Sequence, residues 1–158
     1  MFKSLALIAV VIAIVMLVKF LSGNNAAAQQ TLADGRDFLA KNKLKEGVQT
    51  SSSGLQYEFI KQGNGGATPT AHDKVEVHYH GSLIDGTVFD SSVNRGQSIS
   101  FGLNQVIKGW TEGLQLMAEG DKIRLYIPSE LGYGKRAAGK IPPNSVLIFD
   151  VELIKINP

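Results

Sequence analysis

The chain has 158 residues, of which 44% are hydrophobic and 19% are charged, a mixture typical of one compact globular domain. Its formal net charge is +2, but from Ser51 onward ten Lys/Arg oppose eleven Asp/Glu, which excludes a strongly basic nucleic-acid surface. Cysteine is absent, so disulfides, thiolate nucleophiles and cysteine-held zinc are excluded.

An uncharged apolar run, SLALIAVVIAIVMLV, extends from residue 4 to residue 18 between Lys3 and Lys19. If Lys19 snorkels, the run reaches Leu21 and approaches the ~20 residues that span a bilayer. It also fits a secretory signal sequence, with Ala26-Ala27-Ala28 as the cleavage site. Because that site lies far beyond the apolar run, we favour an uncleaved anchor over residues 4–21, inserted with its N-terminus inside. Both alternatives export the rest of the chain.

Residues 22–53 connect this segment to the main domain. Residues 22–30 are small and polar and predict a linker. Apolar residues then recur near helical spacing, which predicts a short helix over 31–46 that ends before Gly47. The stretch VQTSSSG predicts a loop. We therefore divide the chain into an anchor or signal sequence (1–21), a linker with a short helix (22–53) and a main domain (54–158).

After Gly54 the hydrophobic pattern changes to a period of two, which is typical of half-buried strands. Five segments show it: 55–59, 75–79, 99–101, 123–127 and 147–153. One helical pattern interrupts them, with apolar residues on one face at Val106 or Ile107, Trp110, Leu114 and Met117. Asn104 is available to cap its start, and Gly120 ends it.

These elements predict an α+β fold, in which a twisted, mainly antiparallel sheet of about five strands wraps around one short helix. The N-terminal hydrophobic helix precedes this unit. A single short helix has to pack on the apolar face of the sheet, so Trp110 is expected to point at the sheet and not at solvent.

Several motifs do not indicate catalytic chemistry. GKRAAGK, residues 134–140, has phosphate-loop spacing, but Ile141 replaces the magnesium-binding Ser/Thr and two prolines prevent the following helix. His78 and His80 share one strand face, and two imidazoles without a third ligand are best explained as solvated side chains, so no metal is expected. Neither a GxSxG serine nor a recognisable carboxylate pair is present, which leaves covalent and acid–base catalysis unsupported.

Aromatic residues gather at the ends of the predicted elements, next to one acid. They are Tyr79, Phe89 beside Asp90, Trp110, Tyr133 and Phe149. This placement indicates an apolar pocket with few polar groups. The alternative is that all five aromatic residues only fill the core.

Three stretches in chain order resemble the tacrolimus-binding, FKBP-type peptidyl-prolyl cis-trans isomerases: VHYHGSLIDGTVFDSS, VIKGWTEGLQLMAEGDKIRLYIPSELGYG and IPPNSVLIFDVELIKI. The resemblance covers about Leu55 to Ile156. GLQYEFIKQGNG and the preceding FLAKNKLKEGVQTSSSG further resemble the macrophage-infectivity-potentiator branch, which is exported and usually carries a longer helical dimerisation region. The oligomeric state, monomer or dimer, is therefore left open.

The resemblance implies a proline pocket between sheet and helix, with Trp110 as its floor. The implied catalytic residues are Asp90, Tyr133, Tyr79, Phe89 and Trp110. The implied substrate-binding residues are Phe101, Val106, Ile107, Ile141, Phe149 and Ile99, with the backbone amide of Ile107 as a polar contact and Ile141 on a flap over the site. Ile99 stands where the family often has an aromatic residue, and the loop 135–140 is short and basic, so the preference beside proline is open.

The resemblance also implies the activity, which is isomerisation of X-Pro bonds during protein folding outside the cytoplasm, without a cofactor. The implied partners are X-Pro segments of folding proteins, with tacrolimus-like macrolides as inhibitors and the membrane as the site of anchoring. The alternatives are a chaperone or adaptor that holds proline-containing segments with little turnover, and an inert domain on a membrane stalk.

Overall fold

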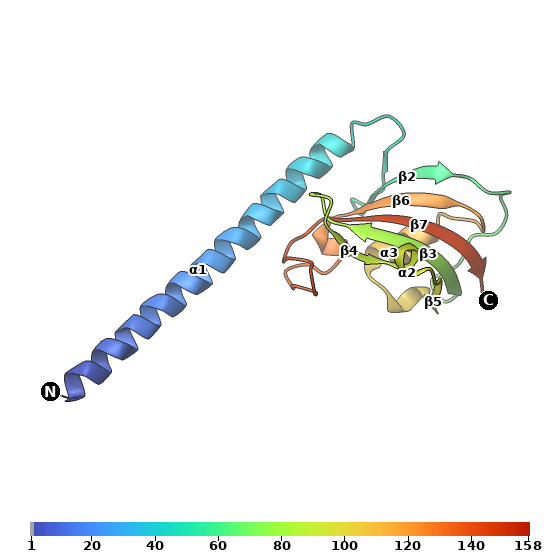
Figure 1. Ribbon diagram of the computed structural model, residues 1–158. Helices are drawn as coiled ribbons and strands as arrows, with labels where there is room; N and C mark the ends of the chain where they lie inside the picture. Colours follow the sequence, from blue (N-terminus) through green and yellow to red (C-terminus); the bar gives the residue numbers. More distant parts are fainter. Residues whose placement is uncertain (1) are drawn as a thin grey trace.

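The structure, a computed structural model, describes residues 2–158, with side chains from Val10 onward. One long helix leads into a sheet that curves around a short helix (Figure 1). The helices are α1 (Phe2–Asn42), α2 (Ser92–Arg95) and α3 (Lys108–Leu114), with 3-10 turns η1 (Leu103–Gln105) and η2 (Ser129–Leu131). The strands are β1 (Gln49–Thr50), β2 (Gln56–Lys61), β3 (Lys74–Ser82), β4 (Val88–Ser91), β5 (Ile99–Gly102), β6 (Lys122–Ile127) and β7 (Leu147–Ile156).

The sheet has the order β1-β2-β6-β7-β3-β4, with β5 also paired to β3, and every pairing is antiparallel. This confirms the predicted α+β fold. The sheet has seven strands and not about five, because the sequences of β1 (QT) and β4 (VFDS) carry no alternation of apolar and polar residues. In β4 the burial does alternate, but one of the two inward positions is the polar Ser91. β1 has only two residues and both are exposed, so the hydrophobic pattern carried no signal for it.

Helix α3 lies unusually close to β6 because two of its glycines face that strand. A Cβ atom built on Gly109 would lie 2.6 Å from Cγ2 of Ile127, and one built on Gly113 would lie 2.7 Å from Cδ2 of Leu125. Both strand residues are fully buried. The close approach brings Trp110, between the two glycines, directly onto the core.

The predicted boundaries of this helix are wrong at both ends. It stops at Leu114, and only turns connect it to Gly120. Asn104 lies in η1, and the N-cap is Ile107, which has no side-chain oxygen to cap with. The hydroxyl of Thr111 instead donates to the Leu103 carbonyl at 2.7 Å and joins α3 to η1.

Helix α1 is continuous from Phe2 to Asn42, so the linker predicted over 22–30 is wrong. The short helix expected over 31–46 is the last part of α1 and ends four residues earlier than expected. The intervening residues include three alanines and two glutamines, which favour helix, and only Gly23 opposes it. The linker was predicted from the small and polar composition of residues 22–30, whereas these residues form a helix.

The C-terminal half of α1 docks on the domain through contacts at several successive turns. Asn144 donates to the Ala28 carbonyl at 3.0 Å, and Cγ2 of Val146 lies 2.8 Å from the point where Gly35 would carry a Cβ. At the helix end, Gln56 accepts from Asn42 at 2.8 Å and donates to the Leu39 carbonyl at 2.9 Å. The Leu39 carbonyl also accepts from the Lys43 amide at 3.1 Å, so the bond from Gln56 adds a second donor and ties the end of α1 to β2.

The N-terminal half of α1 projects clear of the domain (Figure 1). Between Val10 and Leu21 its apolar side chains are about half exposed or more. By length and composition, α1 from Val10 to Asn42 is long and apolar enough to cross a membrane. An apolar surface of this extent marks contact with a membrane or another protein.

Replacing Gly35 with leucine should weaken the docking of α1, since the new side chain would overlap Val146. We expect a loss of about 1–3 kcal/mol in the free energy of unfolding, as in other overpacked contacts. Thermal and denaturant unfolding of the full chain in detergent measure it. Gly23→Leu is the matched control, because no atom lies within 4 Å of its added Cβ. Equal stability of the two variants would show that α1 does not dock at Gly35.

Candidate active site

A cavity of about 600 Å³ opens to solvent between α3, the strands β3, β4, β5 and β7, and the segment 133–141. It is lined by Tyr79, Phe89, Asp90, Ile99, Phe101, Gln105, Val106, Ile107, Trp110, Tyr133, Ala138, Gly139, Lys140, Ile141 and Phe149. All eleven residues predicted for the site therefore line one cavity. Gln105 and residues 138–140 were not predicted, and the hydrophobic pattern gives no signal for polar or small residues in turns.

The base of the cavity is a cluster of aromatic rings centred on Trp110. The indole lies 5.3 Å from the ring of Tyr79, 5.3 Å from Phe101 and 5.1 Å from Phe149, measured between centroids. The contacts with Tyr79 and Phe149 are edge-to-face, the arrangement that aromatic quadrupoles favour. Trp110 is only 5% exposed, so it belongs to the core and also forms the cavity floor.

Ile141 also lines the cavity and is held by a tight turn. Its amide donates to the Ala138 carbonyl at 2.9 Å, and the Ala138 amide donates back to the Ile141 carbonyl at 3.0 Å. The side chain is buried, so this part of the flap packs into the core. Tyr133 lies at the rim and is 44% exposed, which leaves its hydroxyl within reach of a bound chain.

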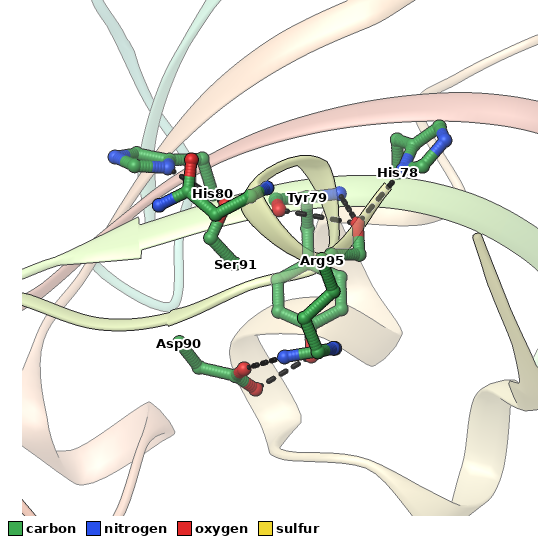
Figure 2. A network of polar contacts seen from close by, with 8 residues as sticks. His78, Tyr79, His80, Asp90, Ser91 and Arg95 are labelled. Carbon is green, nitrogen blue, oxygen red and sulfur yellow. Dashed lines mark hydrogen bonds and ion pairs between the residues drawn. The ribbon is translucent and has the colours of Figure 1, made fainter. Parts of the chain in front are cut away.

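The polar side of the cavity is a three-residue network on β3, β4 and α2 (Figure 2). The Tyr79 hydroxyl donates to Asp90 at 2.5 Å, Arg95 pairs with the same carboxylate, and Nη2 of Arg95 donates to the Tyr79 hydroxyl at 3.1 Å. Arg95 was not predicted. Its position five residues after Asp90 gave no signal, because the short helix that turns it back was itself not predicted.

This network fixes the ionisation of its members. Burial raises the pKa of Asp90, but hydrogen bonds from Tyr79 and Arg95 outweigh it, and the pKa lies below its ordinary value. Burial and the bond to Asp90 raise the pKa of Tyr79. At neutral pH the carboxylate is therefore ionised and the phenol is neutral. A carboxylate with these two donors supplies a fixed charge and is a poor base.

The backbone amide of Ile107 is a free donor at the start of α3. The Ile107 carbonyl accepts from the amides of Trp110 and Thr111, whereas its own N–H has no acceptor within residues 2–158. This amide is the one expected to bind a substrate carbonyl.

Comparisons with known proteins agree with this geometry. Residues 65–154 match the profile of the family described as FKBP-type peptidyl-prolyl cis-trans isomerase, and residues 12–59 match the domain that lies amino-terminal to such isomerases. The chain therefore belongs to the FKBP-type peptidyl-prolyl cis-trans isomerase family. Within it, the N-terminal match indicates the macrophage-infectivity-potentiator branch, as predicted.

Individual relatives support this assignment. An isomerase named FkpA from Aeromonas hydrophila is 57% identical over 122 residues, which are 77% of this chain and 45% of that protein. A macrophage infectivity potentiator from Trypanosoma cruzi is 47% identical over 145 residues, 88% of this chain and 74% of that protein. The crystal structure of FkpA from Escherichia coli superposes with a TM-score of 0.85 at 44% identity, covering 92% of this chain and 69% of that one. The chain spans about half the length of the first two curated relatives it matches.

Replacing Gly109 with alanine should displace α3 from β6 and tilt the cavity floor. We expect a loss of about 1–3 kcal/mol in unfolding free energy and a changed emission from Trp110, the only tryptophan of the chain. Lys108→Ala, on the exposed side of the same helix, is the control. Unchanged stability and emission in Gly109→Ala would contradict the close packing described here.

Proposed function

We propose that the chain is a peptidyl-prolyl cis-trans isomerase that acts on X-Pro bonds of proteins folding outside the cytoplasm. The observation that carries the proposal is the open aromatic cavity, which has the Trp110 indole at its base and, at its edge, the Asp90 carboxylate bound by Tyr79 and Arg95. Family membership supports the same activity. No cofactor is required by this chemistry, because no bond to proline is broken.

The chemical problem is electronic. The two isomers of an X-Pro bond differ by only about 0.5–1 kcal/mol, yet rotation faces a barrier of about 18–20 kcal/mol because amide resonance has to be broken. In the twisted transition state the amide loses its charge separation. A dry apolar cavity therefore disfavours the planar amide more than the twisted one.

The residues of the cavity divide this task between them. In the proposed mode of binding, the proline ring rests on Trp110 between the rings of Tyr79, Phe89 and Phe149, while Phe101, Val106, Ile99 and Ile141 exclude water. The Ile107 amide and the Tyr133 hydroxyl bind the chain on either side of the rotating bond. Asp90, ionised and held by Arg95, fixes the Tyr79 ring that forms one wall.

Lowering the barrier by about 7 kcal/mol gives roughly 10⁵-fold acceleration. We assign this reduction to desolvation of the amide and to contacts that hold the twisted form better than the planar one. The proposal therefore needs no nucleophile and no proton transfer.

The second candidate function is a chaperone or adaptor that holds proline-containing segments with little turnover. It is favoured by a further cavity of about 410 Å³ between α1 and the domain, lined by Thr31, Asp34, Leu83, Ile84, Asp85, Pro142, Ser145 and Val146. This second cavity could bind a part of a client polypeptide that lies outside the proline-binding cavity.

Activity separates the two functions. The full chain in detergent should accelerate proline isomerisation in a short peptide, and tacrolimus should abolish the acceleration. Phe89→Ala or Asp90→Leu should lower kcat/KM by at least tenfold, because each removes a wall or its support. Suppression of aggregation of a proline-free client should remain in both variants if a separate holding activity exists. Absence of any acceleration by the parent chain would overturn the isomerase proposal and leave the holding function.

We further propose that residues 4–21 anchor the protein in the membrane, with the domain facing the exported side. Docking of α1 between Ala28 and Asn42 supports an uncleaved anchor, because cleavage after Ala28 would remove the carbonyl that Asn144 binds. Ala28 lies seven helical steps beyond Leu21, about 10 Å along the helix at 1.5 Å per residue. The isomerase cavity would then stay close to the bilayer surface.

Intact-mass measurement of the chain isolated from its exported compartment tests the anchor. We expect the N-terminal segment to be present and the protein to stay with membranes after alkaline extraction. A soluble product that begins at Gln29 would show instead that the segment is a cleaved signal sequence.

A further inference from the structure

The backbone of Tyr79 lies at a gap in the edge of β3. On one side β4 ends its pairing with β3 at His80↔Ser91, and on the other side β5 begins at Val77↔Ile99. Between them a side chain takes the place of a strand. The buried Ser92 hydroxyl accepts from the Tyr79 amide at 2.7 Å and donates to the Tyr79 carbonyl at 3.2 Å.

The same hydroxyl lies 3.0 Å from Nδ1 of His78. A serine hydroxyl has one proton and two acceptor positions. The Tyr79 amide fills one acceptor position. The contacts to the Tyr79 carbonyl and to His78 are both hydrogen bonds only when the serine proton goes to the carbonyl and Nδ1 of His78 is a donor. The arrangement that satisfies all three contacts therefore has a proton on Nδ1 of His78.

His80 makes the equivalent contact with Ser91, the residue just before α2. Its Nδ1 lies 2.9 Å from the hydroxyl of Ser91, which is the N-cap of α2 and accepts from the Asn94 amide at 3.1 Å. The two histidines therefore hold the two serines that begin this four-residue helix (Figure 2).

The other end of α2 carries Arg95, which binds Asp90 and the Tyr79 hydroxyl in the cavity. His78 and His80 lie on the opposite face of the sheet from the Tyr79 ring, because successive strand residues alternate. The helix thus connects the outer face of the sheet to the Asp90–Tyr79 pair that lines the cavity. Figure 2 shows His78 and His80 on one side of the strands and Asp90 with Arg95 on the other.

Among residues with described side chains, Val10 to Pro158, no other group lies at hydrogen-bond distance from the two rings. Lys122, Asp150 and Glu152 line the same hollow, and Asp150 accepts two bonds from Arg124 at 2.6 and 2.9 Å. Among the residues that the structure describes, no group of three or more His, Asp or Glu is arranged to hold a metal ion. The contacts to Ser91 and Ser92 are the ones that the geometry assigns to these rings.

We propose that His78 and His80 are positioning residues of the isomerase site. They act through Ser91 and Ser92 on α2, and through Arg95 on the Asp90–Tyr79 pair. The proposal rests on the proposed isomerase function for its kinetic part. Its structural part, the Nδ1–H of His78 and its connection to Arg95, stands independently of activity.

Side-chain geometry offers a matched pair of variants at His78. The amide nitrogen of asparagine reaches the position of Nδ1, whereas that of glutamine reaches the position of Nε2. In the full chain in detergent, His78→Asn should keep kcat/KM within about twofold, while His78→Gln and His78→Ala should lower it by roughly five- to tenfold, the scale of one lost hydrogen bond. Equal losses in all three variants would overturn the assignment of the donor to Nδ1.

A double-mutant cycle tests the connection to the cavity. If His78 acts through Arg95, His78→Ala should cost little further activity in an Arg95→Ala background. Full additivity would overturn the connection and leave His78 with a merely structural role.

Nitrogen NMR of the unmodified chain supplies a readout that needs neither a variant nor activity. The proton of the His78 ring should reside on Nδ1, and a proton on Nε2 alone would overturn the proposal. If the parent chain proved inactive, the isomerase proposal would fail, while the NMR result and the effect of His78→Ala on the Tyr79 amide resonance would still decide the structural part.

Discussion

The contact between the Trp110 indole and the rings of Tyr79, Phe101 and Phe149 is the interaction on which the site depends. It forms because α3 approaches β6 without a side chain between them at Gly109, so the indole reaches the core and still borders the cavity. A bulkier residue in place of this glycine would separate helix from sheet. The floor of the cavity is therefore part of the hydrophobic core, so a change to the floor also changes stability.

The polar groups of the cavity are arranged to restrict motion and not to move protons. Asp90 is occupied by Tyr79 and Arg95, and its pKa is lowered while that of Tyr79 is raised. This arrangement suits a reaction whose barrier lies in amide resonance, for which a rigid, dry wall is more useful than an acid or a base. In our proposal, His78 and His80 on the outer face of the sheet also restrict motion, through their contacts with Ser92 and Ser91.

Helix α1 makes the N-terminal segment part of the domain. Its docked half contacts Asn144 and Val146, which follow the cavity residue Ile141 closely in sequence, so α1 packs next to the segment that lines the cavity. In an anchored protein this rigid connection would hold the cavity at a fixed height above the lipid. Client chains emerging at the membrane surface would meet the site at that height.

The alternation of Val75, Val77 and Tyr79, and the helical spacing around Trp110, were enough to predict the sheet, the helix and the packing of Trp110 against the sheet, because burial on one face leaves a periodic pattern. The floor and the walls of the cavity were implied by the motifs that resemble the family. No periodic pattern indicates the role of Arg95, the bond from Ser92 to the Tyr79 backbone or the docking of α1. The docking of α1 and the Ser92 bond join groups far apart in the chain, and Arg95 is placed by a helix of only four residues. Only the folded chain decides those contacts, because they depend on where β4 ends and which helix face meets the domain.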